Sequence, residues 1–165
     1  MKIEVDEGYD VAERAESLGV QVPKGLAILP RNFAVARTKQ ELVYDPHVST
    51  LRKLWREAGL QETGIELGHD RFPRAFERSA DWIGPTVFIA SLLVTQNPYA
   101  VQIALGIVQE FASDLLRRRP RSATVKLEVI VETKQGRQTK RVRYEGDVTG
   151  LTKLVEVVDR VSKGK

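Results

Sequence analysis

The residues of this chain best suited to acid–base or metal chemistry lie in two short segments. His69 lies in the Glu66–Asp70 loop, and Asp45 and His47 lie in the other segment. Imidazole and carboxylate groups together can transfer protons or bind a metal ion. The two histidines lack the i, i+4 spacing of a helical metalloprotease motif, and the neighbouring glycines indicate a loop. We therefore interpret the residues as loop hydrogen bonding, and a small enzyme that uses the Glu66–Asp70 loop remains the second alternative.

Motifs of other common enzyme classes are absent from the sequence. There is no phosphate-binding loop of the GxxxxGK[ST] or GxGxxG type, and no GxSxG nucleophile elbow. The chain has no cysteine, which excludes disulfides, thiolate nucleophiles and thiolate zinc sites. We therefore predict no catalytic residue, no metal and no cofactor.

Charge is distributed unevenly along the chain. Residues 1–82 have a net charge of −2 and residues 83–165 of +6, which together give the +4 of the whole chain. A basic half can bind nucleic acid or an anionic membrane. Its basic residues include Arg117 to Arg121, Lys134, Arg137, Lys140 and Arg141. Because carboxylates alternate with them, a solvated surface is the main interpretation and a basic nucleic-acid-binding protein is the first alternative.

A β-hairpin is predicted at about 124–132 and 138–145, with a two-residue turn at Gln135-Gly136. In this register apolar residues face each other on one side and opposite charges on the other, as cross-strand neighbours should. The pairs are Val129 with Val142, Leu127 with Tyr144, Glu128 with Arg143, and Lys126 with Glu145. A slip of one residue would break both sets, so the register is well determined.

A final helix is predicted from about 148 to 161, with Asp147 as its N-cap. Its apolar stripe would cover one face of the sheet and consists of Leu151, Leu154, Val155, Val158 and Val161. The core predicted from these patterns includes Leu105, Val108, Leu127, Val129, Val142, Tyr144, Leu154 and Val158.

An apolar segment precedes the hairpin. The run IGPTVFIASLLV begins at Ile83, and apolar residues at helical spacing follow from Val101 to Leu115. Asn97 and Pro98 between them are a typical helix start. We predict a helical hairpin whose first helix is buried on most sides. Each half is shorter than the roughly 20 residues of a membrane span, so membrane insertion is not favoured.

The first half of the chain gives weaker signals. It predicts strands at 1–5 and 26–29, a helix capped by Asp10 that ends at Gly19, and a helix from Ser49 to Gly59. Residues 60–82 are interpreted as a loop with a short helix from about 73 to 82.

The predicted fold class is α+β, a helical hairpin plus a small antiparallel sheet made by the C-terminal β-hairpin and its packing helix. We expect one compact domain. Residues 1–82 would form an N-terminal α/β segment of unknown type, and residues 83–165 the apolar helical hairpin and a ββα unit.

The order of elements in the second half is distinctive. PTVFIASLLV leads into NPYAVQIALGIVQEFASDLLRRR, then into the strands VKLEVIVE and KRVRYEG, and finally into DVTGLTKLVEVV. This order, over residues 84–158, resembles the small effector-associated, adaptor-type domains of bacterial conflict and defence systems. The resemblance implies an adaptor or tethering role through protein–protein contacts, and it transfers no active-site residue.

We therefore predict a non-enzymatic protein–protein interaction module, with an adaptor or accessory subunit of a bacterial defence or signalling complex as its role. The 83–111 segment is so dense in apolar residues that we expect a partner protein or a second copy to cover part of it. The residues predicted to bind the partner are Val87, Phe88, Leu92, Arg117, Arg118 and Arg119. The first ten residues lack the features of a signal peptide, and we expect a cytoplasmic protein.

Overall fold

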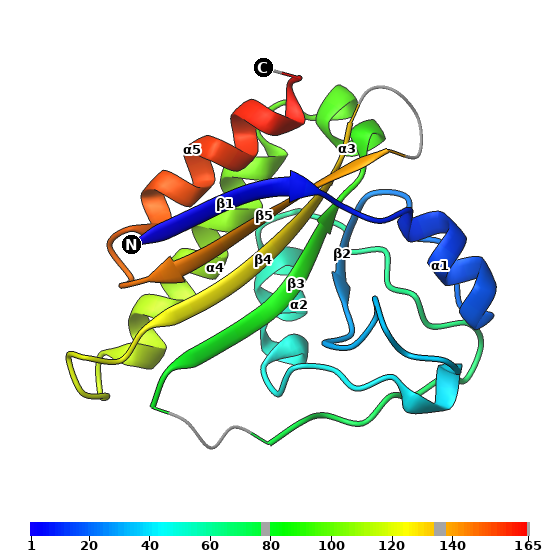
Figure 1. Cartoon of the computed structure of the whole chain (residues 1–165), viewed down its shortest axis with the longest axis horizontal. Coiled ribbons are helices and arrows are strands. Elements are labelled where there is room, and N and C mark those ends of the chain that lie inside the picture. The colour runs from blue at the N-terminus through cyan, green and yellow to red at the C-terminus, as the bar shows by residue number, and fades with distance from the viewer. Residues whose placement is uncertain (77–79, 134–137, 165) are drawn as a thin grey trace.

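One open sheet of five strands organises the chain, in the order β1-β5-β4-β3-β2 (Figure 1). The computed structural model describes residues 1–76, 80–133 and 138–164. The strands are β1 (Lys2–Glu7), β2 (Leu26–Leu29), β3 (Trp82–Ile89), β4 (Val125–Glu132) and β5 (Thr139–Gly146). The sheet is mixed, because β3 and β4 are parallel and all other neighbours are antiparallel. Both the 1–82 and the 83–165 segments supply strands to it.

The helices lie mainly on one side of the sheet. They are α1 (Val11–Leu18), α2 (Val48–Glu57), α3 (Ser91–Gln96), α4 (Ala100–Leu116) and α5 (Leu151–Ser162), with a short 3₁₀ helix at Lys39–Glu41. Figure 1 shows α4 and α5 behind the sheet and α1 beyond β2. The fold class is therefore α+β. No helix in the described part of the chain is long and apolar enough to cross a membrane.

The strands β4 and β5 pair in the register expected from the sequence. Val129 lies opposite Val142, and Glu128 lies opposite Arg143. The turn at Gln135-Gly136 falls outside the described residues. On the other side of β5, β1 continues the same pattern, with Glu4 opposite Arg143. Charge complementarity therefore extends over three strands of one face.

The prediction of a helical hairpin is wrong. Trp82–Ile89 is the strand β3, and the helix α3 begins only at Ser91. β-branched residues favour a strand here, and Val87 to Ile89 are buried on both faces, which removes the polar–apolar alternation. The prediction of a small antiparallel sheet is corrected with it. The parallel β3–β4 pair needs a long crossover, which α3 and α4 provide.

Several local predictions in the first half agree with the structure. Asp10 accepts a hydrogen bond from the Glu13 amide at 3.0 Å, and Gly19 ends α1 with a φ of +72°. A side chain would be strained at that left-handed φ. Helix α2 begins at Val48, one residue before the predicted cap. The helix predicted at about 73 to 82 is wrong for its described residues, which are not helical.

The C-terminal helix begins later than predicted. Its first residue is Leu151, so Asp147 is not the N-cap residue itself. The Asp147 carboxylate instead accepts hydrogen bonds from the Gly150 amide and the Thr149 hydroxyl, both at 2.9 Å. These bonds fold the chain into the turn that precedes α5. Every residue of the predicted core is buried: Leu105, Val108, Leu127, Val129, Val142, Tyr144, Leu154 and Val158.

The burial of β3 can be tested by substituting Phe88. Phe88 is 1% exposed, so we expect Phe88→Ala to lower the free energy of unfolding by about 3–5 kcal/mol in urea denaturation. Leu92, four residues further on, is 51% exposed, and Leu92→Ala should change the free energy of unfolding by less than about 0.5 kcal/mol. Similar small effects at both positions would contradict this placement of the strand.

Candidate functional site

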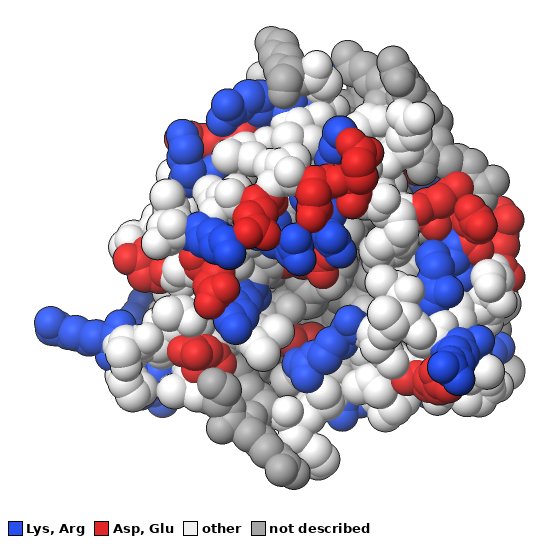
Figure 2. Space-filling view, in the orientation of Figure 1, with Lys and Arg blue, Asp and Glu red and all other residues white. Residues whose placement is uncertain are grey.

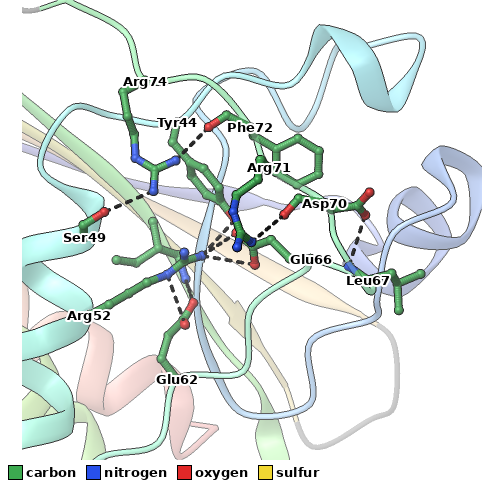
Figure 3. Close-up of polar contacts among 11 residues, drawn as sticks. Tyr44, Ser49, Arg52, Glu62, Glu66, Leu67, Asp70, Arg71, Phe72 and Arg74 are labelled. Atoms are coloured by element: carbon green, nitrogen blue, oxygen red, sulfur yellow. Dashed lines mark hydrogen bonds and ion pairs between the residues drawn. The ribbon is translucent and has the colours of Figure 1, made fainter.

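Arg52 of α2 joins two carboxylates of the irregular segment that follows the helix (Figure 3). Its Nε is 3.1 Å from Glu62 Oε2, and its Nη2 is 3.0 Å from Glu66 Oε1. The same Nη2 donates to the Tyr44 hydroxyl at 2.9 Å, and that hydroxyl donates to Glu66 Oε1 at 2.6 Å. We call Tyr44, Arg52, Glu62 and Glu66 the Arg52 cluster.

Three segments position the Arg52 cluster. The chain at Glu62 runs beside the outer edge of β2, where the Thr63 amide donates to the Leu26 carbonyl at 2.7 Å. Tyr44 is fully buried just before α2. Its ring lies between the guanidinium groups of Arg52 and Arg74, each 4.9 Å from the ring centroid (Figure 3). Such cation–π contacts add to the ion pairs.

The ion pairs of the cluster join α2 to the segment that follows it, and we call this structural role a clamp. Burial raises the pKa of Glu62 above its ordinary value, and the positive charge of Arg52 only partly offsets this rise. At Glu66 burial is outweighed by the hydrogen bond from Tyr44 and the charge of Arg52, which together lower its pKa. Glu66 therefore stays ionised and fully engaged as an acceptor. The arrangement holds residues 60–76 against α2 rather than presenting a free acid or base.

The side chains with predicted acid–base or metal chemistry have separate partners, although the His47 amide donates to Asp45 Oδ1 at 3.2 Å. In the Glu66–Asp70 loop, Asp70 pairs with Lys39 at 3.1 Å, and His69 is exposed. Asp45 pairs with Arg31 at 3.2 Å. The His47 ring contacts Phe111 on α4, with their centroids 5.3 Å apart. Within residues 1–76, 80–133 and 138–164, no three His, Asp or Glu residues are grouped as metal ligands would be.

A trough of about 390 Å³ lies on the sheet face that is turned away from α4 and α5, which we call the front face. Its floor includes the irregularity in β3 between Ile83 and Thr86, where Gly84 and Pro85 interrupt the pairing with β4. Burial raises the pKa of Asp45, which lines one wall. Leu127 and Tyr144 also line the trough, and its remaining lining residues are polar or charged: Lys2, Glu4, Arg31, Thr86, Lys126, Glu128, Arg143 and Glu145.

Charges of both signs cover the front face over β1, β5 and β4 (Figure 2). Arg141 Nε is 3.1 Å from Asp6, and Arg143 Nη2 lies 2.9 Å from Asp6 and 3.2 Å from Glu4. Lys140, whose position in β5 alternates with Arg141 and so belongs to the helix-side face, pairs with Glu7. A phosphate group would have to displace a carboxylate from these cations. Lys134 and Arg137 lie outside the described residues.

The residues predicted to bind a partner lie in three different environments. Val87 and Phe88 are buried in β3, which corrects the expectation that they face a partner. Leu92 is exposed on α3. At the end of α4, Arg117 pairs with Asp114 at 2.8 Å, Arg118 is exposed, and Arg119 donates to the Ala80 carbonyl at 3.0 Å.

Leu92 lies in a part of the sequence without charged side chains. The stretch from Trp82 to Gln109 contains no charged residue, although 29% of the whole chain is charged. Most of it is buried, but α3 and the start of α4 are not. Their exposed residues, which we call the neutral patch, are Leu92, Thr95, Gln96, Pro98, Tyr99, Gln102 and Ile103.

Sequence patterns did not indicate the Arg52 cluster. Its members Tyr44 and Glu66 lie 8 and 14 residues from Arg52 along the chain, with no regular spacing. The neutral patch did carry a signal, because the absence of charge from Trp82 to Gln109 is visible in the sequence. Only the position of β3 shows which of these residues reach the surface.

No family model, no curated protein and no solved structure matches this chain. A functional interpretation therefore depends on the chain's own geometry.

The clamp can be tested with Arg52→Met, which keeps a long apolar side chain but leaves Glu62 and Glu66 without their cation. We expect a loss of about 2–3 kcal/mol in unfolding free energy, below the full cost of breaking a deeply buried pair. Amide exchange should accelerate across residues 60–72. Arg56→Met, at an exposed position of the same helix, is the matched control. Equal behaviour of the two variants would contradict a clamping role.

Proposed function

We propose that this protein is a non-enzymatic protein-binding module whose partner docks on the neutral patch. The observation that supports this is the exposure of Leu92, Tyr99 and Ile103, at 51%, 66% and 39%, within a patch whose own residues carry no charge. Lys163, at the end of α5, borders this patch beside Thr95 and Pro98. Interface cores are depleted of charged residues and enriched in aromatic side chains. A neutral surface of this kind loses little hydration energy when a partner covers it.

Hydrogen bonds tie the elements beneath the neutral patch to the core, and a preorganised surface loses less entropy on binding. The Ser91 amide and hydroxyl donate to Glu132 Oε1 at 3.2 and 3.0 Å, and so fix the start of α3 to the end of β4. Under α4, the buried Trp55 Nε1 donates to the Ala104 carbonyl at 3.0 Å. The patch is therefore presented by elements tied to the core.

The resemblance of residues 84–158 to effector-associated domains supports the same class of function. We propose an adaptor or accessory subunit of a bacterial defence or signalling complex, with another protein as the partner. The pairing of Arg141, Arg143 and Lys140 with carboxylates favours this role over nucleic-acid binding. The distribution of Glu66, Asp70 and Asp45 over separate ion pairs favours it over catalysis.

The test is a charge placed in the patch. The partner would be identified by crosslinking to the wild-type chain in cells, and its affinity measured with purified proteins. We expect Ile103→Glu to weaken binding at least about 30-fold, since loss of an interface anchor typically costs about 2 kcal/mol.

The control is Val35→Glu, which introduces the same charge at a side chain that is 77% exposed and lies outside the patch. It should bind as the wild type does, and circular dichroism should show that both variants are folded. Undiminished binding by Ile103→Glu would overturn the assignment of the partner to this surface.

A further inference from the structure

We propose that the free edge of β1 pairs with β1 of a second copy of this chain, about a two-fold axis at Ile3. This interface would join the two sheets into one continuous sheet. It is separate from the neutral patch and does not depend on the partner proposed above.

The outer edge of β1 has backbone groups available for pairing. The Gly8 amide donates to the Thr139 carbonyl across the β1–β5 ladder. In an antiparallel pair, alternate residues direct their backbone groups to the neighbouring strand. The even-numbered residues therefore bond to β5, and Ile3 and Val5 direct their N–H and C=O groups outward. Within the described part of the chain no strand lies beyond β1.

The two edges of the sheet differ in their protection. At the β2 edge, the segment at Glu62 and Thr63 runs alongside and bonds to Leu26. The β1 edge has no proline and no register shift against β5, which are two of the devices that block edge-to-edge pairing. Charged side chains on an edge strand can also prevent edge-to-edge pairing, and β1 carries several. The order of these charges along β1 decides which registers of pairing they oppose.

The sequence of β1 complements itself in one register. Centred on Ile3, an antiparallel pair sets Lys2 opposite Glu4 of the second copy on the front face. On the helix side Met1 meets Val5 of the second copy, and Ile3 meets its own equivalent. Opposite charges and apolar pairs are each favourable across strands.

Neighbouring registers that use the same outward-facing groups are opposed by like charges. Centring the pair on Glu4 sets two copies of Glu4 face to face, although Lys2 then lies opposite Asp6, and centring it on Val5 sets Glu4 opposite Asp6. Backbone parity allows all three centres, and the charge order favours Ile3 because that register alone has no like-charged pair. The charges of β1 thus specify one pairing rather than prevent all pairing.

The helix side of this edge is also incompletely covered. Helix α5 packs over β4 and β5, and Val5 on β1 is left 48% exposed. On one side of α5, Thr152 accepts a hydrogen bond from Gln109 of α4. Val157 and Val161 lie on the opposite side of α5, away from α4, and are half-buried. A second copy related by the two-fold axis would bring its own helix layer to the same side and cover these valines.

Single cysteines test the register, because the chain has none of its own. Directly opposite residues in a hydrogen-bonded pair have Cα atoms about 5.5 Å apart, within the roughly 4.4–6.8 Å of a disulfide. We expect Ile3→Cys to form a covalent dimer under mild oxidation. Val5→Cys is the matched control, since its two copies would lie four residues out of register, at least about 13 Å apart.

Sedimentation of the wild-type chain should show a dimer, and Ile3→Pro should sediment as a folded monomer because it removes only an outward N–H group. A wild-type chain that remains a monomer and no crosslinking of Ile3→Cys would overturn the proposal. Crosslinking of Val5→Cys in preference to Ile3→Cys would overturn the register.

Discussion

The structure depends on the pairing of β3 with its two neighbours. This strand lies between the parallel strand β4 and the antiparallel strand β2, and its last residues are buried on both faces. Burial of a strand on both faces requires side chains without charge and a covering layer on each side. The uncharged stretch that starts at Trp82 meets the first requirement. The helices behind the sheet cover one side of β3, and on the other side Arg31 and Asp45 border the trough beside Thr86.

The division of charge over the surface follows from this constraint. Beyond β3 the sheet opens to solvent on its front face, and there Arg141 and Arg143 are neutralised by Asp6 and Glu4 within the chain. Behind the sheet, the helices α3 and α4 connect the parallel strands β3 and β4. The exposed side of α3 and of the start of α4 forms the neutral patch.

The elements that could be predicted from the sequence are those whose partners lie nearby in the chain. The β4–β5 register was recoverable because Val129 and Val142 sit in adjoining strands with complementary neighbours. β3 was predicted to be helical because a strand buried on both faces has no alternation of polar and apolar residues, and because its apolar run continues into α3. The Arg52 cluster joins residues that are distant and irregularly spaced, so no periodicity indicates it. The neutral patch could be located only after β3 had been assigned correctly.

Hydrogen exchange of the β3 amides, followed by NMR, tests the central claim most directly. The strand is predicted to exchange only through global unfolding at Val87, Phe88 and Ile89, with protection equal to that of Ile130 in β4. The Cα chemical shifts of these residues should be those of extended backbone. Helical Cα shifts from Pro85 to Ile89, or exchange of these amides far faster than that of Ile130, would contradict the account.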